Sequence, residues 1–424
     1  MAKKQKSILE IVYDYQTRLQ GVANSLGMEL ATLIGETDNA VVKLLQRELT
    51  KKVAGNSASA IKKELERLKK LIAKIEQIRK PSYKAVKDLL LSTSADVVQA
   101  GTDEIAKEAN WLLGEQARAE REKRFCKTLT NAQQRAIFEY SSIDGKTIAE
   151  WFQNWQRSDL ETIANAVQRA SVEQMTVIYI TRLIRGTKEN NYTDGILATT
   201  QTSAVRLART VINGVSNNAR VETIKANQDV IDGVKFVGTL DGKTCIYCAS
   251  LDGQIWRDAE MGQARRPPIH PNCRCTLIPY VELKDDDGNV IDLDEKRPAA
   301  NADFDKLAKD AYNQNARDKG LKRRWEDLSP STRLKYYYQA QKDYEKRTGN
   351  KAYEQVSGST SFAEYFENQD ESFKRSWLGA KLYELYKAGK LNEEKLFKPD
   401  LSYKSKISEL YDTNNNNNDI DNIH

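Results

Sequence analysis

The first part of the chain repeats hydrophobic and polar positions at the spacing of long amphipathic helices. Residues 7–125 are almost free of proline and rich in Leu, Ile, Ala, Lys and Glu. The clearest segment, IKKELERLKKLIAKIEQIRK, has the hydrophobic spacing of a coiled-coil seam at Ile61, Leu65, Leu68, Ile72 and Ile75. Because this seam is short, we predict a helical hairpin that packs on its neighbours and ends at Pro81.

The same segment carries eight Lys and Arg residues against three Glu. An ordinary solvated helix face is the simpler interpretation of such a charge run, and a DNA-facing surface is the functional one. The candidate nucleic-acid-binding residues are Lys62, Lys63, Lys69 and Lys70. Contacts of this kind would be weak, independent of base sequence and sensitive to salt.

Helical patterns continue through residues 141–232. Thr147 and Glu150 form a capping-box pair ahead of three aromatic residues, Trp151, Phe152 and Trp155, which we predict to be core and not a base-stacking platform. A long helix follows within residues 199–227, with one apolar stripe at Ala204, Leu207, Ala208, Val211, Ile212 and Val215. Its arginines, Arg206, Arg209 and Arg220, fit either phosphate or carboxylate contacts or a solvated face.

The pattern changes at residue 233. Residues 233–283 alternate strand-like runs with two Asp-Gly pairs, Asp241–Gly242 and Asp252–Gly253, which are typical of hairpin turns. This is the one clearly β-rich portion of the sequence. We predict a mainly α chain with a small β-rich module, an α+β organisation with an elongated helical N-terminal region over residues 1–140.

Beyond this module we predict a linker over residues 284–300. Its KDDDGNVIDLDEK stretch lacks the spacing of a calcium-binding loop. Residues 301–411 are predicted to be helical, with helix starts at Ser329–Pro330 and at the Ser361 and Glu364 capping box. The Asn-rich tail, residues 412–424, is predicted to be disordered.

Composition adds a polar character to this organisation. The 424 residues are 30% charged, and their formal net charge is +6, with a mean hydropathy of −0.67. A weak positive excess permits contact with nucleic acid but does not demand it. The sequence has no apolar run of about 18 residues and no apolar signal-peptide core, so we expect a cytoplasmic protein without a membrane-spanning segment.

Four of the five cysteines lie close together, with one histidine among them. In a cytosolic chain such clustering favours a metal site over a disulfide pair or unliganded thiols. The candidate ligands are Cys245, Cys248, His270, Cys273 and Cys275, five residues for the four places of a tetrahedron. Zn²⁺ fits thiolate and imidazole donors best, and a closed ligand set predicts a structural metal. The spacing leaves open which four bind.

A metal-dependent nuclease is the alternative from a different class. It would place His270 beside a catalytic metal, with an open coordination position and a general base nearby. These loops contain no second histidine or compact carboxylate set, and Asp241 and Asp252 are better explained as turn residues. We therefore predict no catalytic residue and no enzymatic activity.

Two segments together resemble the phage Mu F-like minor head proteins, also called head-morphogenesis proteins. LDGKTCIYCASLDGQIW followed by PPIHPNCRC is similar to the signature of that family, and the preceding ARTVINGVSNNARVETI is similar to its upstream helix. SFAEYFENQDESFKRSWLGAKLYELYKAGKL resembles a second recurring element, a helical pair around a Leu-Gly step. The resemblance covers residues 170–280 and 359–397.

This resemblance implies a virion protein of few copies, located inside the head near the portal vertex after assembly in the host cytoplasm. The partners it implies are the portal protein and capsid or scaffolding proteins, with non-specific contact to phage DNA during packaging or ejection. It also implies that the five cysteine and histidine positions named above are the metal ligands.

Overall fold

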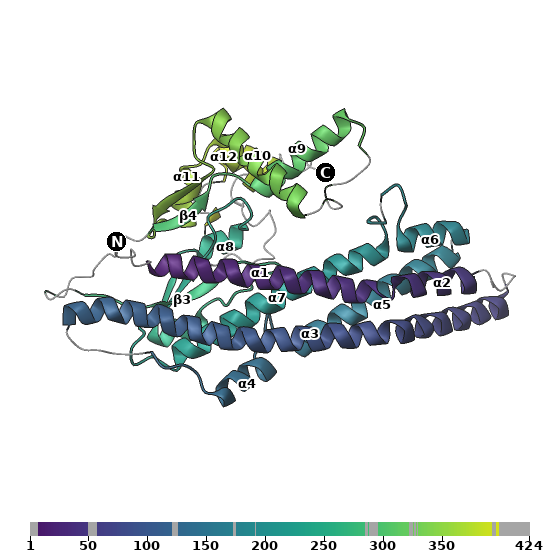
Figure 1. Cartoon of the computed structure of the whole chain (residues 1–424), viewed down its shortest axis with the longest axis horizontal. Coiled ribbons are helices and arrows are strands. Elements are labelled where there is room, and N and C mark those ends of the chain that lie inside the picture. Colours follow the sequence, from purple (N-terminus) through teal and green to yellow (C-terminus); the bar gives the residue numbers. More distant parts are fainter. Residues whose placement is uncertain are drawn as a thin grey trace.

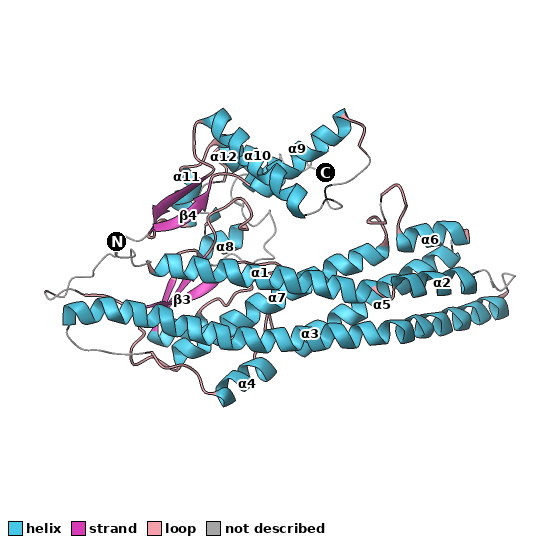
Figure 2. Ribbon diagram, viewed as in Figure 1, coloured by secondary structure: helices cyan, strands magenta, loops and turns pink. Residues whose placement is uncertain are grey.

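The computed structural model describes residues 7–49, 57–120, 126–172, 175–190, 192–284, 287, 296–321, 325, 328, 330–391 and 396–397. A bundle of long helices lies along the longest axis of the molecule, and a smaller C-terminal region sits over one end of it (Figure 1). Helices dominate, with two small antiparallel sheets (Figure 2). The predicted mainly α class with a small β portion is confirmed. The tail, residues 412–424, and most of the predicted linker lie outside the described residues.

The bundle is built from the first seven helices: α1 (Ile8–Gly35), α2 (Asp38–Leu49), α3 (Ala58–Glu120), α4 (Asn131–Tyr140), α5 (Ile148–Val172), α6 (Val177–Arg185) and α7 (Ile196–Lys225). Helix α7 packs against both α1 and α3, and its predicted apolar stripe lies in the main core of the bundle. The capping box of Thr147 and Glu150 starts α5 as predicted, and Phe152 and Trp155 are core residues.

Helix α3 does not end at Pro81, so that prediction is wrong. Pro81 lies on the exposed side of the helix. Gln77, whose carbonyl has no backbone donor because proline has no N–H, is an exposed residue as well. The residues around it are anchored: Arg79 Nη1 donates to Asp38 at 2.7 Å, and the Tyr83 hydroxyl donates to Asp159 at 2.6 Å. Tertiary packing therefore keeps the helix continuous at Pro81, a residue that would end it in an isolated peptide.

The predicted seam of α3 is buried over only part of its length. Leu68 and Ile75 lie in the core shared with α2, α5 and α6, whereas Ile61 and Leu65 are about half exposed. Arg220 of α7 is fully buried, so the solvated face considered for it is wrong. Its guanidinium donates to Glu108 of α3 at 2.6 Å and to the carbonyl of Leu277 at 2.8 Å.

The first sheet has the strand order β2-β1-β3. Its strands are β1 (Gly233–Val237), β2 (Ile255–Arg257) and β3 (Thr276–Tyr280). The Asp-Gly pairs do not form two-residue hairpin turns: helix α8 (Ile246–Leu251) stands between β1 and β2, and a 3₁₀ turn (Asp258–Gln263) follows β2. Gly253 has a φ of 83° and follows Asp252, the C-cap of α8, in a turn that the Gln254 N–H closes on the Leu251 carbonyl at 3.0 Å.

The C-terminal region contains a second sheet, which the sequence did not predict. Strand β4 (Lys296–Ala300) falls inside the predicted linker and pairs with β5 (Tyr353–Ser357). Pro298 has no N–H to donate to a ladder, but a two-stranded ribbon leaves room for it because each strand has one unpaired edge. The helices of this region are α9 (Phe304–Asp318), α10 (Pro330–Thr348), α11 (Phe362–Glu367) and α12 (Glu371–Lys387).

The C-terminal region is attached to the first sheet by buried contacts. Arg297 of β4 bonds both carboxylate oxygens of Asp252 at 3.0 and 3.1 Å, and it also donates to the carbonyl of Gly238 at 2.7 Å. The Trp377 indole donates to the Thr244 carbonyl at 2.6 Å. Residues of α8, α11 and α12 share one hydrophobic core. The two parts therefore form a continuous structure around α8.

None of the helices in the described parts of the chain combines the length and apolar character needed to cross a bilayer.

Candidate metal centre

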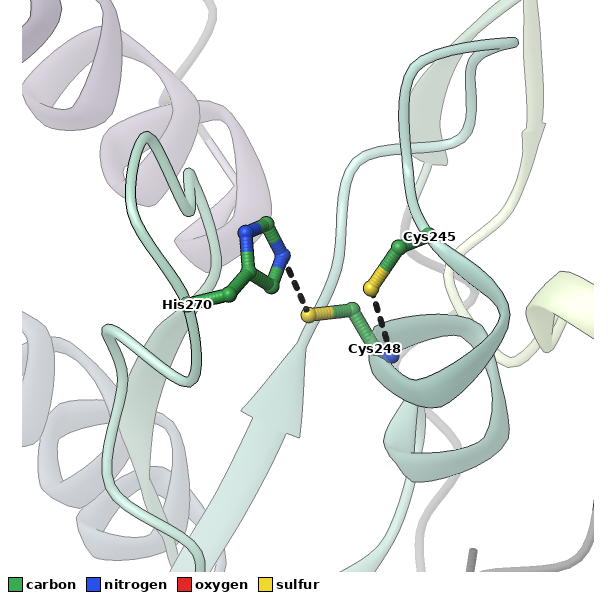
Figure 3. A group of neighbouring side chains, drawn as sticks. All are labelled: Cys245, Cys248 and His270. Atoms are coloured by element: carbon green, nitrogen blue, oxygen red, sulfur yellow. Dashed lines mark hydrogen bonds between the residues drawn. The ribbon is translucent and has the colours of Figure 1, made fainter. Parts of the chain in front are cut away.

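The early pair of candidate ligands lies at the start of α8. Cys245 is the N-cap residue of this helix, and its sulfur accepts the backbone N–H of Cys248 at 3.4 Å. Capping places the two sulfurs on the same side of the first helical turn. Figure 3 shows both sulfurs on the side of α8 that faces His270.

The late residues lie on a loop that leads directly into β3. The backbone N–H of Cys273 donates to the carbonyl of His270 at 3.0 Å, which closes a tight turn, and Asn272 within it has a φ of 63°. Strand β3 begins at Thr276, next to Cys275, and its pairing with β1 fixes where the loop ends. The antiparallel sheet thus draws the two distant loops together.

The structure brings all five predicted ligands into one cluster. Their donor atoms form two overlapping triads, within each of which every pair lies within 4.8 Å: Cys245, Cys248 and His270, and Cys248, Cys273 and Cys275. Cys248 belongs to both. Its Sγ atom is 3.4 Å from His270 Nε2 and 3.8 Å from Cys273 Sγ (Figure 3 shows the first contact).

These separations match the edges of a zinc tetrahedron. With Zn–S near 2.3 Å and Zn–N near 2.0–2.1 Å, two sulfur ligands lie about 3.8 Å apart, and a sulfur and a nitrogen about 3.5 Å. The His270 ring is also oriented for this role. Its Nδ1 faces the carbonyl of Pro271 at 2.9 Å, which favours a proton on Nδ1 and makes Nε2 the ring atom that faces the sulfurs. The donor set therefore fits a zinc ion.

The electrostatics of the cluster favour a cation. A hydrogen bond between Cys245 and Cys248 lowers the pKa of the Cys245 thiol to about 5. A second hydrogen bond, between Cys273 and Cys248, lowers the pKa of the Cys273 thiol. Burial opposes protonation of His270, but its hydrogen bond with Cys245 and the negative charge of Cys273 raise its pKa to about 9. The hydrogen bond with Cys245 raises the pKa of Cys248, and the pKa of Cys275 is raised as well, so negative charge falls on two of the four thiols. A divalent cation would neutralise that charge and favour the thiolate form of the other two.

Two asparagines of α7 support the late loop, and the sequence analysis did not identify them. The Asn213 amide donates to the carbonyls of Cys273 at 2.9 Å and Cys275 at 3.3 Å. The Asn217 carbonyl oxygen accepts the N–H of Leu277 at 3.0 Å. Both side chains are buried. The sequence did contain a signal for them: Asn213 and Asn217 are four residues apart and therefore lie on one side of α7, next to its apolar stripe.

Arg274 and Asp241 form a second support. The Arg274 guanidinium donates to both oxygens of Asp241 at 2.6 and 2.7 Å, which ties the HPNCRC loop to the loop before α8. Burial opposes ionisation of Asp241, but these bonds and the charge of Arg274 lower its pKa overall. Asp241 and Asp252 are both engaged with arginines, so each does more than form a turn.

The four candidate DNA-binding lysines do not join this cluster. Lys62, Lys63, Lys69 and Lys70 are all exposed on the first part of α3, at the end of the bundle away from β3 (Figure 1). The structure leaves their proposed contact with phosphate untested.

Comparison with known proteins supports the resemblance predicted above. Residues 143–278, about a third of the chain, match the family described as Phage Mu protein F like protein. The match begins just before α5 and ends within β3, so it includes α7 and all five members of the cluster. Neither the curated proteins nor the solved structures gave a match. The C-terminal element, residues 359–397, lies outside the matched segment and stays a prediction.

Proposed function

We propose that this chain, which carries a phage Mu F-like region over residues 143–278, is a phage head-morphogenesis protein, and more closely a structural minor head protein at the portal vertex. In this role it takes part in capsid assembly, and it contacts portal and capsid or scaffolding proteins and, non-specifically, phage DNA. The family match over residues 143–278 is the observation that carries the proposal.

Fractionation of purified virions tests this assignment. The proposal expects the protein at a few copies per particle, in DNA-filled heads, and co-purifying with the portal complex after gentle disruption. Complete absence from virions that are otherwise intact would contradict it.

Within this protein we propose that the five-residue cluster holds one structural Zn²⁺. Three of its sulfurs, those of Cys248, Cys273 and Cys275, belong to residues that are 1–3% exposed. Such a closed donor set contributes folding free energy and leaves little access for substrate. Cys248 is the donor common to both triads, so we expect every four-ligand arrangement of this cluster to need it.

Substitution of single cysteines tests the zinc proposal. Cys248→Ser should lose the metal and lower the unfolding midpoint, as read by elemental analysis and thermal unfolding. Cys126→Ser is the matched control, because Cys126 is also a buried free cysteine but is not a member of either triad. Equal metal content in the two variants would show that the ligands are wrongly assigned.

A hydrolytic role for the cluster receives less support. The nearby carboxylates of Asp241 and Asp252 are held by arginines and are not positioned as free bases. Incubation of plasmid DNA with the purified protein and Mg²⁺ or Zn²⁺ should therefore give no cleavage. Cleavage that His270→Ala abolishes would establish a nuclease instead.

A further inference from the structure

The end of the bundle opposite the first sheet leaves large apolar side chains exposed. The start of α3, the end of α2 and the whole of α6 lie at this end (Figure 1). On α3, Ile61 is 54% and Leu65 is 51% exposed. On α6, Ile178 is 68% and Tyr179 is 55% exposed. Apolar side chains that gather on one part of a molecule indicate an interaction surface more than isolated ones do.

The exposed residues of α3 continue a seam that is buried further along the same helix. Leu68 and Ile75, which follow at the seam spacing, are 3% and 0% exposed. Arg67 Nη1 donates to the carbonyl of Glu48 at 2.6 Å, which places Arg67 beside the last turn of α2. At about 1.5 Å per residue, the first turns of α3 extend well past that point. In the described part of the chain, Leu68 of the seam thus belongs to a hydrophobic core shared with α2, whereas Ile61 and Leu65 belong to no such core and are about half exposed.

Positive charge flanks this exposed stretch. Lys62, Lys63, Lys69 and Lys70 are exposed around it. Arg67 and Glu64 neutralise each other at 2.6 Å, and Glu66 is exposed, so the four lysines still outnumber the acidic side chains here. Helix α6 repeats the combination, with two arginines and no acidic residue. A second copy of the chain would bring like charges together, whereas an acidic partner would be attracted.

We propose that the first turns of α3, through Ile61 and Leu65, bind an amphipathic helix of a partner protein that has acidic residues beside its apolar face. The apolar residues of the partner helix would pack against Ile61 and Leu65, so that the seam of α3 would be buried along its first two turns as well. A DNA duplex would contact only the lysines, because its phosphates have no favourable interaction with the apolar side chains of Ile61 and Leu65 that lie among them. This inference concerns the end of the bundle remote from the metal cluster and does not rest on the proposed function.

A defined peptide probe tests the proposal on the full-length chain. The probe is a three-heptad helix with Leu at positions a and d and Glu at e and g, compared with the same peptide carrying Lys at e and g. Fluorescence anisotropy should show saturable binding of the Glu peptide only. The double variant I61S/L65S should weaken this binding at least tenfold. The chain should stay folded, with its unfolding midpoint lowered only slightly, because both side chains are about half exposed and lie outside the hydrophobic cores.

Leu334→Ser supplies the control, because Leu334 is 48% exposed on α10, in the C-terminal region. It should bind the Glu peptide like the parent chain. Equal binding of the two peptides, or no effect of I61S/L65S, would overturn the proposal. Preferred binding of a 20-base-pair duplex that ignores Ile61 and Leu65 would assign the surface to DNA, and a dimer lost in I61S/L65S would assign it to a second copy. Both results would also overturn it.

Discussion

At the scale of single residues, the cluster of four cysteines and His270 depends on side chains that are not among its members. Asn213 holds the carbonyls of Cys273 and Cys275, and Arg274 ties the same loop to Asp241. These contacts fix the backbone from which the sulfurs project, so they set the ligand positions before any ion binds.

We expect Asn213→Ala to destabilise the fold by about 1–3 kcal/mol, because the Cys273 carbonyl loses its donor and the Cys275 carbonyl keeps only the 3.4 Å bond from Asn217. The same loss should weaken zinc binding by about 10- to 100-fold. Chemical denaturation and competition with a chelator measure the two effects. Thr202→Ala is a matched control on the exposed face of α7 and should change stability by less than about 0.5 kcal/mol. Indistinguishable results for the two variants would remove the supporting role of Asn213.

At the scale of elements, patterns of hydrophobic residues predicted the helices well because burial and periodicity coincide along them. The stripe of α7, the capping boxes of α5 and α11 and the start of α10 at Pro330 all hold in the structure. The failures occur where tertiary contacts override local preference. Helix α8 replaces a predicted hairpin turn, and β4 occupies part of a predicted linker, because both elements are stabilised by partners distant in sequence.

Helix α3 offers a direct test of that override. Pro81→Ala should stabilise the protein, by up to about 3 kcal/mol, because the exposed position regains a backbone donor for the Gln77 carbonyl without any new clash. Thermal or urea unfolding measures the change. A loss of stability would mean that α3 requires a distortion at Pro81, contrary to the continuous helix described above.

At the scale of the whole molecule, Arg297 connects three parts of the chain. It contacts Asp252 and Gly238 near the first sheet, Tyr13 of α1 and the carbonyl of Thr360. Arg297 and Asp252 are both almost completely buried. Removing one member of such a pair leaves an uncompensated charge inside the protein.

Arg297→Ala should therefore cost about 3–5 kcal/mol and loosen the C-terminal region from α8. Hydrogen exchange should show lost protection in β4, β5 and α11 before the bundle is affected. Arg257→Ala, which breaks the exposed pair with Glu282, should cost no more than about 1 kcal/mol. A uniform loss of protection across the whole chain would contradict the separate attachment of this region.

The sequence predicted the members of the Cys and His cluster but not the way they are supported. Cysteine and histidine stand out by type and spacing, so Cys245 to Cys275 could be identified without a structure. The supporting residues are asparagine, arginine and aspartate, which are common on surfaces. Only the packing of α7 against β3 shows that Asn213, Asn217 and Arg220 point inward.

X-ray absorption at the zinc edge of the intact chain tests the central claim most directly. The account predicts one zinc per chain, with a four-coordinate shell in which sulfur at about 2.3 Å dominates, alone or with one nitrogen at about 2.0–2.1 Å. A shell made of oxygen and nitrogen without sulfur, or a folded chain that binds no zinc at all, would contradict it.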